Sequence, residues 1–350
     1  MKSTPPLAGG ALDRDAATRM SADHLGAAWA DPGARLLRIR GAEIPVVESG
    51  GSLGLAWVAT SGELRVATSA NVVPDVYLGR IDGAPRFARL LPAPSPDAAQ
   101  SPDSARDGSA DEEILGERWS HPFPVGSRLV EAEREAVGVA SALLRWHEAA
   151  GFSPRDGRPT EPAQGGWARL DEHGGEHFPR TDPAVIVLIE HEDRVLLGSN
   201  ALWESGRFSL LAGFVEAGES LEQAVAREVF EESGVRLDDI TYVTSQPWPF
   251  PRSLMLGFRA RLASDADPED LTPDPTEISE LRWFTRDELR DPGPGLILPM
   301  PLSIARWMID RWVDEDGAGT ERTESRSGSS SESLPVASAE GTRVEGVDGV

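Results

Sequence analysis

The sequence predicts an α+β protein with a β-rich N-terminal region and a C-terminal region that mixes strands and helices. Between about residues 36 and 92, short apolar runs alternate with turn residues, and Asp82-Gly83 is a strong hairpin signal. Residues 126–150 and 301–315 have the apolar spacing of helices. From residue 182 onward, apolar strand-like runs flank a further helix, so both element types share one region.

The length of 350 residues suggests two or three domains. We expect an N-terminal domain over 1–125, a helix and connector over 126–180, and a C-terminal domain over 181–315. Residues 93–113 and 316–350 are rich in small and polar residues and poor in bulky apolar ones. These two segments are therefore expected to be a disordered insertion and a disordered tail.

Composition narrows the function. The net charge of -24 argues against a nonspecific nucleic-acid binder, although an enzyme could still engage one end of an RNA. The absence of cysteine excludes disulfides and thiolate metal sites. No apolar run is long enough to cross a bilayer, and the N-terminus has no apolar signal-peptide core. We expect no membrane partner and a cytoplasmic location.

One segment, from residue 213 to residue 235, fits G-x5-E-x7-R-E-U-x-E-E-x-G-U without a gap, where U is aliphatic. Ser220 and Gln223 form a capping-box pair, and Gly234 suits the left-handed end of a helix. The fixed positions are Gly213, Glu219, Arg227, Glu228, Val229, Glu231, Glu232, Gly234 and Val235. The spacing predicts one helix of ordinary length.

Three acids on this helix, Glu228, Glu231 and Glu232, are spaced i, i+3 and i+4, which puts them on one side. Like charges at this spacing destabilise a helix, and acids are disfavoured near its C-terminus. A hard divalent cation such as Mg²⁺ relieves this repulsion, since it prefers oxygen ligands. The alternative is a solvated acidic face, which the complete motif disfavours.

A second motif, SQPWPFPRS, covers residues 245–253. Its three prolines predict a stiff loop. Trp248 and Phe250 alternate with the prolines, and rigid aromatic faces suit stacking on a flat heterocycle. A rigid connector whose aromatic residues complete the core is the alternative, and residue type alone leaves both interpretations open.

The first motif resembles the signature of the Nudix hydrolases, and both motifs together resemble the NADH pyrophosphatase (NAD⁺ diphosphatase, NAD-cap decapping) family. YLGRIDGAPRFA and LLRWHEAAGFSPRDGRPTEPAQGGWAR are similar to that family's N-terminal domain and to its approach to a zinc ribbon. HFPRTDPAVIVLI is similar to the start of its catalytic domain. The resemblance implies an NADH-pyrophosphatase-like N-terminal domain, a ribbon-like connector, a Nudix α/β/α sandwich and a homodimer.

The resemblance also implies site residues. Those expected to bind Mg²⁺ or Mn²⁺ are Glu228, Glu231, Glu232 and Glu277. Arg227 would orient the glutamates, and Glu219 would hold the loop before the helix. Phe214 and Trp248 would pack on the nicotinamide. Gln246, Ser253, Met255 and Ala305 would line the nucleotide pocket, with a packing role as the alternative for the last two.

The connector departs from the family pattern. The positions of the family's four zinc-binding cysteines are Ser153, Asp156, Leu170 and His173 here. A tetrahedral four-cysteine site is therefore lost, and no zinc is expected. Asp156, His173 and His177 could offer three ligands, but we interpret their spacing as coincidence.

The implied reaction is hydrolysis of the diphosphate in NADH or NAD⁺ to nicotinamide mononucleotide and AMP, with removal of NAD caps from the 5′ end of RNA as the same chemistry. Either Glu231 or Glu277 could accept the proton of the attacking water. The alternatives are another substrate such as ADP-ribose, or a non-catalytic nucleotide sensor. The SQPWPFPRS motif disfavours the first alternative, and the intact glutamates disfavour the second.

Overall fold

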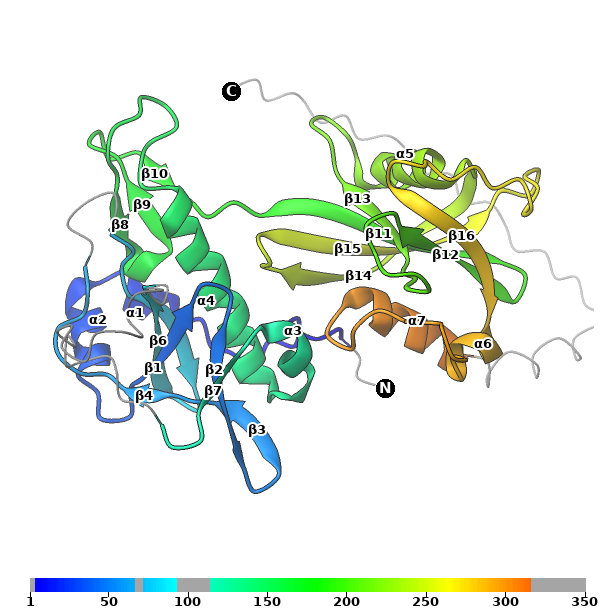
Figure 1. The fold of residues 1–350 in the computed structure, drawn as a ribbon. Coiled ribbons are helices and arrows are strands. Elements are labelled where there is room, and N and C mark those ends of the chain that lie inside the picture. The colour runs from blue at the N-terminus through cyan, green and yellow to red at the C-terminus, as the bar shows by residue number, and fades with distance from the viewer. Residues whose placement is uncertain (1–3, 67–71, 93–113, 316–350) are drawn as a thin grey trace, which may run out of the picture. The chain divides into compact units, whose positions relative to one another are not determined.

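The computed structural model describes residues 4–66, 72–92 and 114–315. It confirms the α+β class (Figure 1). The expected insertion at 93–113 and the expected tail at 316–350 lie outside the described residues. Within the described ranges, no helix has the length and apolar content needed to cross a membrane.

Among the residues described before the connector, the structure has four helices, seven strands and a short 3₁₀ turn. They are α1 (Ala16–Arg19), α2 (Ala22–Trp29), β1 (Arg35–Arg40), β2 (Ile44–Ser49), β3 (Ser52–Leu55), β4 (Val58–Ala59), β5 (Val76–Ile81), β6 (Ala84–Leu91), β7 (Arg118–Ser120), α3 (Pro122–Val125), η2 (Gly126–Arg128) and α4 (Glu131–Ala149). The strands form two sheets, ordered β4-β1-β6-β5 and β3-β2-β7. The helices α1 and α2 were not predicted, because each is too short to give a clear apolar period.

The hairpin at Asp82-Gly83 is confirmed. It joins the antiparallel strands β5 and β6, and both turn residues have positive φ, 52° and 76°. Alternate residues of β1 face opposite sides of the sheet: Leu37 belongs to the core that includes α4, while Leu36 belongs to the core that includes α2. Helices therefore cover both faces of this sheet.

The connector holds β8 (Glu161–Ala163), a 3₁₀ turn η3 (Gln164–Gly166), β9 (Ala168–Leu170) and β10 (Glu176–His177), in the order β10-β9-β8. A buried polar network joins it to α4. The fully buried Arg169 donates through Nε to Thr160 Oγ1 (2.7 Å) and through Nη1 to His147 Nδ1 (2.9 Å). The Nε2–H of His147 in turn donates to the carbonyl of Gly166 (2.9 Å).

The C-terminal part contains one sheet ordered β14-β15-β11-β12-β16, with β13 paired to β11. Its elements are β11 (Asp182–His191), β12 (Arg194–Asn200), β13 (Leu211–Phe214), α5 (Leu221–Ser233), β14 (Leu237–Trp248), β15 (Ser253–Leu262), β16 (Ile278–Thr285), α6 (Arg286–Arg290) and α7 (Ile304–Asp314).

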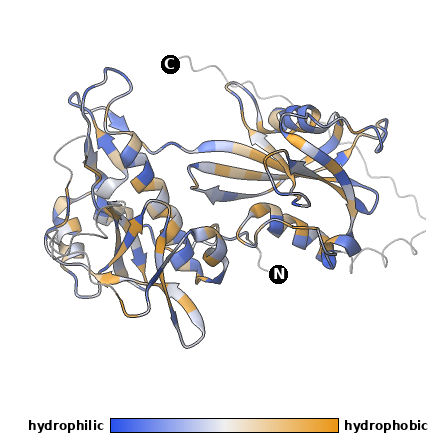
Figure 2. Cartoon of the chain, in the orientation of Figure 1, coloured by the Kyte–Doolittle hydropathy of each residue, from blue (hydrophilic) through white to orange (hydrophobic). Residues whose placement is uncertain are grey.

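Strand β11 explains the layering of this sheet. Val185 and Val187 pack in the core that contains α5, whereas Ile186 and Leu188 pack in the core that contains α7. A strand buried on both faces reads as a continuous apolar run, as 184–189 does. Hydrophobic and hydrophilic residues alternate in bands along α4 and α7 (Figure 2), as expected for helices that cover a sheet. The result is an α/β/α sandwich (Figure 1).

One local expectation was wrong. The SQPWPFPRS segment is not all loop, because residues 245–248 form the end of β14, paired with residues 253–256 of β15. Only residues 249–252 form the turn between the two strands. Pro247 is tolerated in β14 because this strand lies at the edge of the sheet, where a missing N–H leaves no ladder bond unmade.

Candidate functional site

Helix α5 presents the acidic motif. The Ser220 hydroxyl accepts from the Gln223 amide, and the Gln223 side chain accepts from the Ser220 amide, so the predicted capping box is confirmed. Gly234 ends the helix with φ 75°, and its N–H donates to the carbonyl of Phe230. Val225 and Val229 are fully buried against the sheet, which fixes the opposite side of α5 and the direction of its glutamates.

Arg227 gathers the carboxylates of the motif. Its Nε and Nη2 atoms donate to both oxygens of Glu219, at 2.8 and 2.9 Å. Its Nη1 atom lies 3.0 Å from Glu228 Oε1 and 2.9 Å from Glu231 Oε2. The Arg227 guanidinium and the amide of Glu216 lower the pKa of the Glu219 carboxyl to about 2. Glu219 is therefore anionic at neutral pH and fixes the loop before α5.

Glu232 is the most constrained of these acids. Its side chain is buried, and its Oε2 atom has no hydrogen-bond partner. Burial, and then the negative charges of Glu228 and Glu277, raise its pKa to about 8. Burial also raises the pKa of Glu228. The Glu232 carboxyl thus lacks a positive charge that would offset the cost of ionising it in this position, whereas for Glu228 the contact with Arg227 offsets part of that cost.

The acids line an open cavity on one side of α5. Its walls are Arg227, Glu228, Phe230, Glu231, Glu232, Gly234, Thr272, Pro273, Asp274, Pro275 and Glu277. The structure thus brings the four predicted metal ligands to one cavity. Nevertheless, no three His, Cys, Asp or Glu side chains in the described ranges are arranged as a ready-made metal site. The Arg227 guanidinium contacts one oxygen of Glu228 and one of Glu231.

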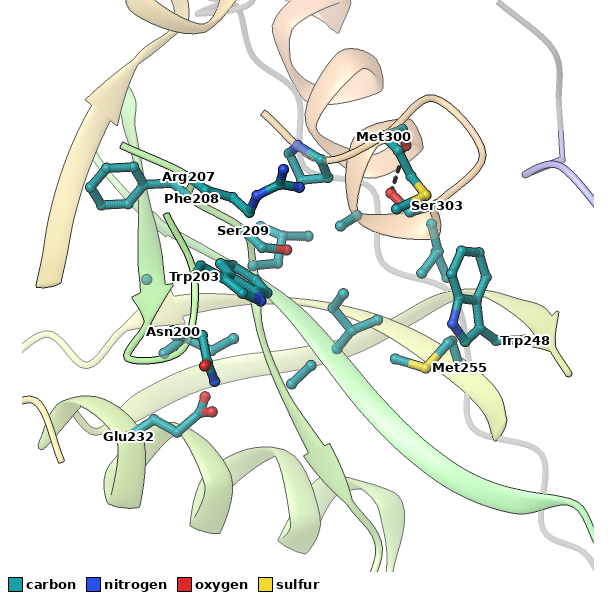
Figure 3. A pocket seen from close by; sticks show the side chains of 18 of the residues that line it. Asn200, Trp203, Arg207, Phe208, Ser209, Glu232, Trp248, Met255, Met300 and Ser303 are labelled. Atoms are coloured by element: carbon teal, nitrogen blue, oxygen red, sulfur yellow. Dashed lines mark hydrogen bonds between the residues drawn. The ribbon is translucent and has the colours of Figure 1, made fainter. Parts of the chain in front are cut away.

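A second cavity, of about 340 Å³, lies between the sheet and the start of α7 (Figure 3). Glu232 borders both cavities. Four of the six predicted substrate-binding residues line the second cavity, namely Gln246, Trp248, Met255 and Ala305. Sequence reasoning missed Asn200, Trp203, Arg207, Phe208, Ser209, Met300 and Ser303, which also line it. Only Trp203 gave a signal, as a tryptophan among turn-forming residues.

Trp203 lies in the turn after β12, and its amide donates to the carbonyl of Asn200 (3.0 Å). The amide of Ala201 in the same turn donates to the carbonyl of Glu277 (2.8 Å), so this turn is tied to the loop that carries the fourth acid. The side chains of Asn200 and Glu232 point toward one another in Figure 3. The turn therefore links the wall of the second cavity to the acidic cavity.

Gln246 has a structural role in addition to lining the cavity. It is fully buried, and its Nε2 atom donates to the carbonyls of Pro6 (2.7 Å) and Leu302 (2.9 Å). Its Oε1 atom accepts from the amide of Ile304 (2.7 Å). Both N–H groups of the side-chain amide are therefore used in holding Pro6 and the segment before α7, and only one lone pair of its oxygen is left for a ligand.

Two predicted residues lie away from this cavity. Phe214 is 58% exposed at the end of β13, and its carbonyl accepts from Arg227 Nη2 (2.9 Å). Ser253, at the start of β15, lines a separate cavity of about 270 Å³ with Arg252 and Leu254. Neither the Phe214 nor the Ser253 side chain lines the cavity that Trp248 lines in this chain.

The connector residues make local contacts, in which the side chain of Asp156 hydrogen-bonds that of Ser153. Ser153 is buried and accepts from the amide of Arg155, while Asp156 is exposed and accepts from the amide of Arg158. The exposed His173 lies 3.2 Å from a Glu172 oxygen.

Nε2 of His177 lies 3.3 Å from Asp171, and Leu170 is 37% exposed. Of the positions that match the family's cysteines, Ser153 and Asp156 thus stabilise turns, and Leu170 and His173 lie at the surface.

Comparisons with known proteins agree with this geometry. A NUDIX domain model matches residues 180–301. The chain is similar to the NAD-capped RNA hydrolase NudC of Mycobacterium bovis, with 39% identity over 329 residues, covering 89% of this chain and 96% of that protein.

It is also similar to NudC of Salmonella schwarzengrund, with 43% identity over 180 residues (51% of this chain, 66% of that protein). The human NAD-capped RNA hydrolase NUDT12 is 38% identical over 208 residues (55% of this chain, 44% of that protein). Because the match to the M. bovis protein spans nearly its whole length, and because the motif helix and its acids occupy one cavity, this chain belongs to the NudC family of Nudix hydrolases.

Proposed function

We propose that this chain hydrolyses the diphosphate of NADH and NAD⁺ to nicotinamide mononucleotide and AMP, and removes NAD caps from RNA. The relatives named NAD-capped RNA hydrolase support this substrate class. The observation that carries the proposal is the position of Glu232, which borders both the acidic cavity and the aromatic-lined cavity. A diphosphate at the acids can therefore keep an attached ring in the neighbouring cavity.

The acidic residues fit a divalent cation. Glu232 has a buried oxygen without a partner, and the donor set consists of carboxylates, which hard cations prefer. Mg²⁺ or Mn²⁺ would be held by Glu228, Glu231, Glu232 and Glu277. A cation bound there neutralises phosphate charge and lowers the pKa of bound water.

The chain's own residues have distinct roles in this proposal. In the hydrolysis, a water oxygen forms a bond to one phosphorus while the bond from that phosphorus to the bridging oxygen breaks, and the bridging oxygen leaves with the other phosphate. The proton of the water passes to Glu231 or Glu277. Arg227 orients Glu228 and Glu231, and Glu219 holds Arg227 through its two-pronged ion pair.

The second cavity would bind the nicotinamide or adenine part of the substrate. Trp203 and Trp248 offer aromatic surface at its walls, while Met255 and Ala305 supply apolar contacts. Phe214 and Ser253 would complete the pocket only if another copy of the chain or a rearrangement brings them to it. We further propose a homodimer that acts in the cytoplasm, on the basis of the family resemblance.

The experiment incubates the purified full chain with NADH and, separately, with NAD-capped RNA, each with Mg²⁺ or Mn²⁺. Glu231→Gln is the catalytic control. Release of reduced nicotinamide mononucleotide and AMP, and of 5′-monophosphate RNA, by the wild type alone is the expected result. If the folded wild type cleaves ADP-ribose but neither of these substrates, the substrate assignment is wrong.

A further inference from the structure

A group of aromatic rings surrounds Trp248 on the side of the N-terminal region. The Phe123 ring is stacked on the Trp248 indole, with centroids 5.3 Å apart and planes inclined by 23°. Phe250 meets both rings edge to face, at 5.3 and 5.5 Å. His121 packs edge to face on Phe123 at 4.2 Å. One face of the indole is thus covered by Phe123, while the rest of the half-buried side chain borders the cavity of Figure 3.

Trp248 depends on these rings for its orientation. Its indole N–H makes no hydrogen bond within the part of the chain that the structure describes. Other tryptophans, by contrast, are fixed by such bonds: Trp283 donates to the carbonyl of Pro268 and Trp167 to that of Tyr77. Because Trp248 is also the last residue of the edge strand β14, backbone pairing constrains it on one side only.

Phe123, in contrast, is firmly anchored. Its amide donates to His121 Nδ1 (3.2 Å), and it lies in the short helix α3. Just beyond α3, Arg134 of α4 donates to the carbonyls of Gly126 (2.9 Å) and Leu129 (2.7 Å). The buried Arg134 therefore fixes the segment after Phe123 to α4.

The same segment supports the opposite wall of the cavity. An ideal Cβ on Gly126 would lie only 3.0 Å from Leu302 Cδ2, so the backbone at Gly126 packs closely on Leu302. Leu302 lies just before Ser303 and Ile304, which line the cavity, and its carbonyl accepts from Gln246. The segment from His121 to Gly126 thus contacts two walls of the cavity.

We propose that Phe123 is a positioning residue for the nucleotide site: it holds the Trp248 indole as a wall of the cavity, and so contributes to substrate binding although it lies outside the Nudix domain. This inference rests on the proposed function. A base that stacks on Trp248 then has only the indole surface that Phe123 leaves open.

The test is a double-mutant cycle on NADH hydrolysis with Phe123→Ala, Trp248→Ala and the double variant. Phe123→Ala should raise KM by about three- to tenfold and leave kcat unchanged, which is the range expected from loss of one aromatic pair. Phe123→Tyr should restore the wild-type KM. The double variant should have the KM of Trp248→Ala, because Phe123 acts through that ring.

Phe152→Ala is the matched control, since Phe152 is a half-exposed phenylalanine that lines neither cavity of the site. Unfolding temperatures of all variants are measured in parallel, and Phe123→Leu, with the same expected rise in KM, replaces Phe123→Ala if the latter does not fold. Three results would each overturn the inference. The first is a KM in the double variant that equals the product of the two single effects, and the second is an unchanged KM in Phe123→Ala or Phe123→Leu. The third is a loss of kcat that Phe123→Tyr does not rescue. A wild type that does not cleave NADH would overturn the proposed function, and the inference with it.

Discussion

The backbone of Gly213 lies against the carboxylate of Glu228. A Cβ at position 213 would overlap the Glu228 carboxylate group. The space that this acid occupies thus explains the first glycine of the motif. A special backbone angle does not, since Gly213 does not have a positive φ.

Gly213→Ala is therefore expected to displace Glu228 and to lower kcat for NADH by about a hundredfold, the loss that a misplacement of about 1 Å can cause. Steady-state kinetics with Mg²⁺ measure the effect. Gly293→Ala is the control, because a Cβ there meets nothing within 4 Å. Equal rates for the two variants would show that the position of Glu228 does not matter for the reaction.

Arg227→Lys is expected to lower kcat by about ten- to a hundredfold with little change in KM, because a lysine cannot reproduce the two parallel bonds to Glu219. Hydrolysis of NADH by the two proteins provides the measurement. Arg236→Lys, which changes an exposed arginine paired with Asp265 at 2.9 Å, should have the wild-type rate. A fully active Arg227→Lys variant would mean that charge alone suffices at this position.

Glu232→Gln is expected to raise the unfolding temperature of the metal-free protein, because it removes a buried carboxylate that lacks a partner. The same variant should lose most of the rise in unfolding temperature that Mg²⁺ or Mn²⁺ gives the wild type. Thermal unfolding with a chelator, and then with added metal, tests both effects. Glu222→Gln, on the exposed first turn of α5, should respond to metal as the wild type does.

His147 makes stability depend on pH. Burial, together with the positive charge of Arg169, lowers its pKa to about 4 against the opposing bond to Gly166. The unfolded chain therefore binds a proton at His147 more readily than the folded chain does. The contribution of His147 to the free energy of unfolding is thus complete above pH 6.5 and is lost as the pH falls toward 4. The loss amounts to at most about 3 kcal/mol.

Denaturant unfolding between pH 4 and pH 7 measures this dependence. His147→Gln should reduce it, whereas His24→Gln, at an exposed position, should leave it unchanged. An equal pH dependence in wild type and His147→Gln would show that other groups cause the loss of stability.

The sequence by itself determined the features that depend on neighbours along the chain. The helix from 221 to 233 follows from its capping box and Gly234, and the hairpin at Asp82-Gly83 follows from residues that tolerate positive φ. The acids of one helix face were identified for the same reason, because i, i+3 and i+4 spacing places them together in any helix.

Only the tertiary structure decided which distant segments share a cavity. Trp203, Arg207 and Met300 come from turns and loops whose local sequence does not indicate what they face, and Phe123 reaches Trp248 across more than a hundred residues. The same holds for Gln246, whose buried amide bonds to Pro6 and Leu302. These contacts depend on how the sheet, α7 and the α3 segment pack, and side-chain packing between remote elements leaves no periodic signal in the sequence.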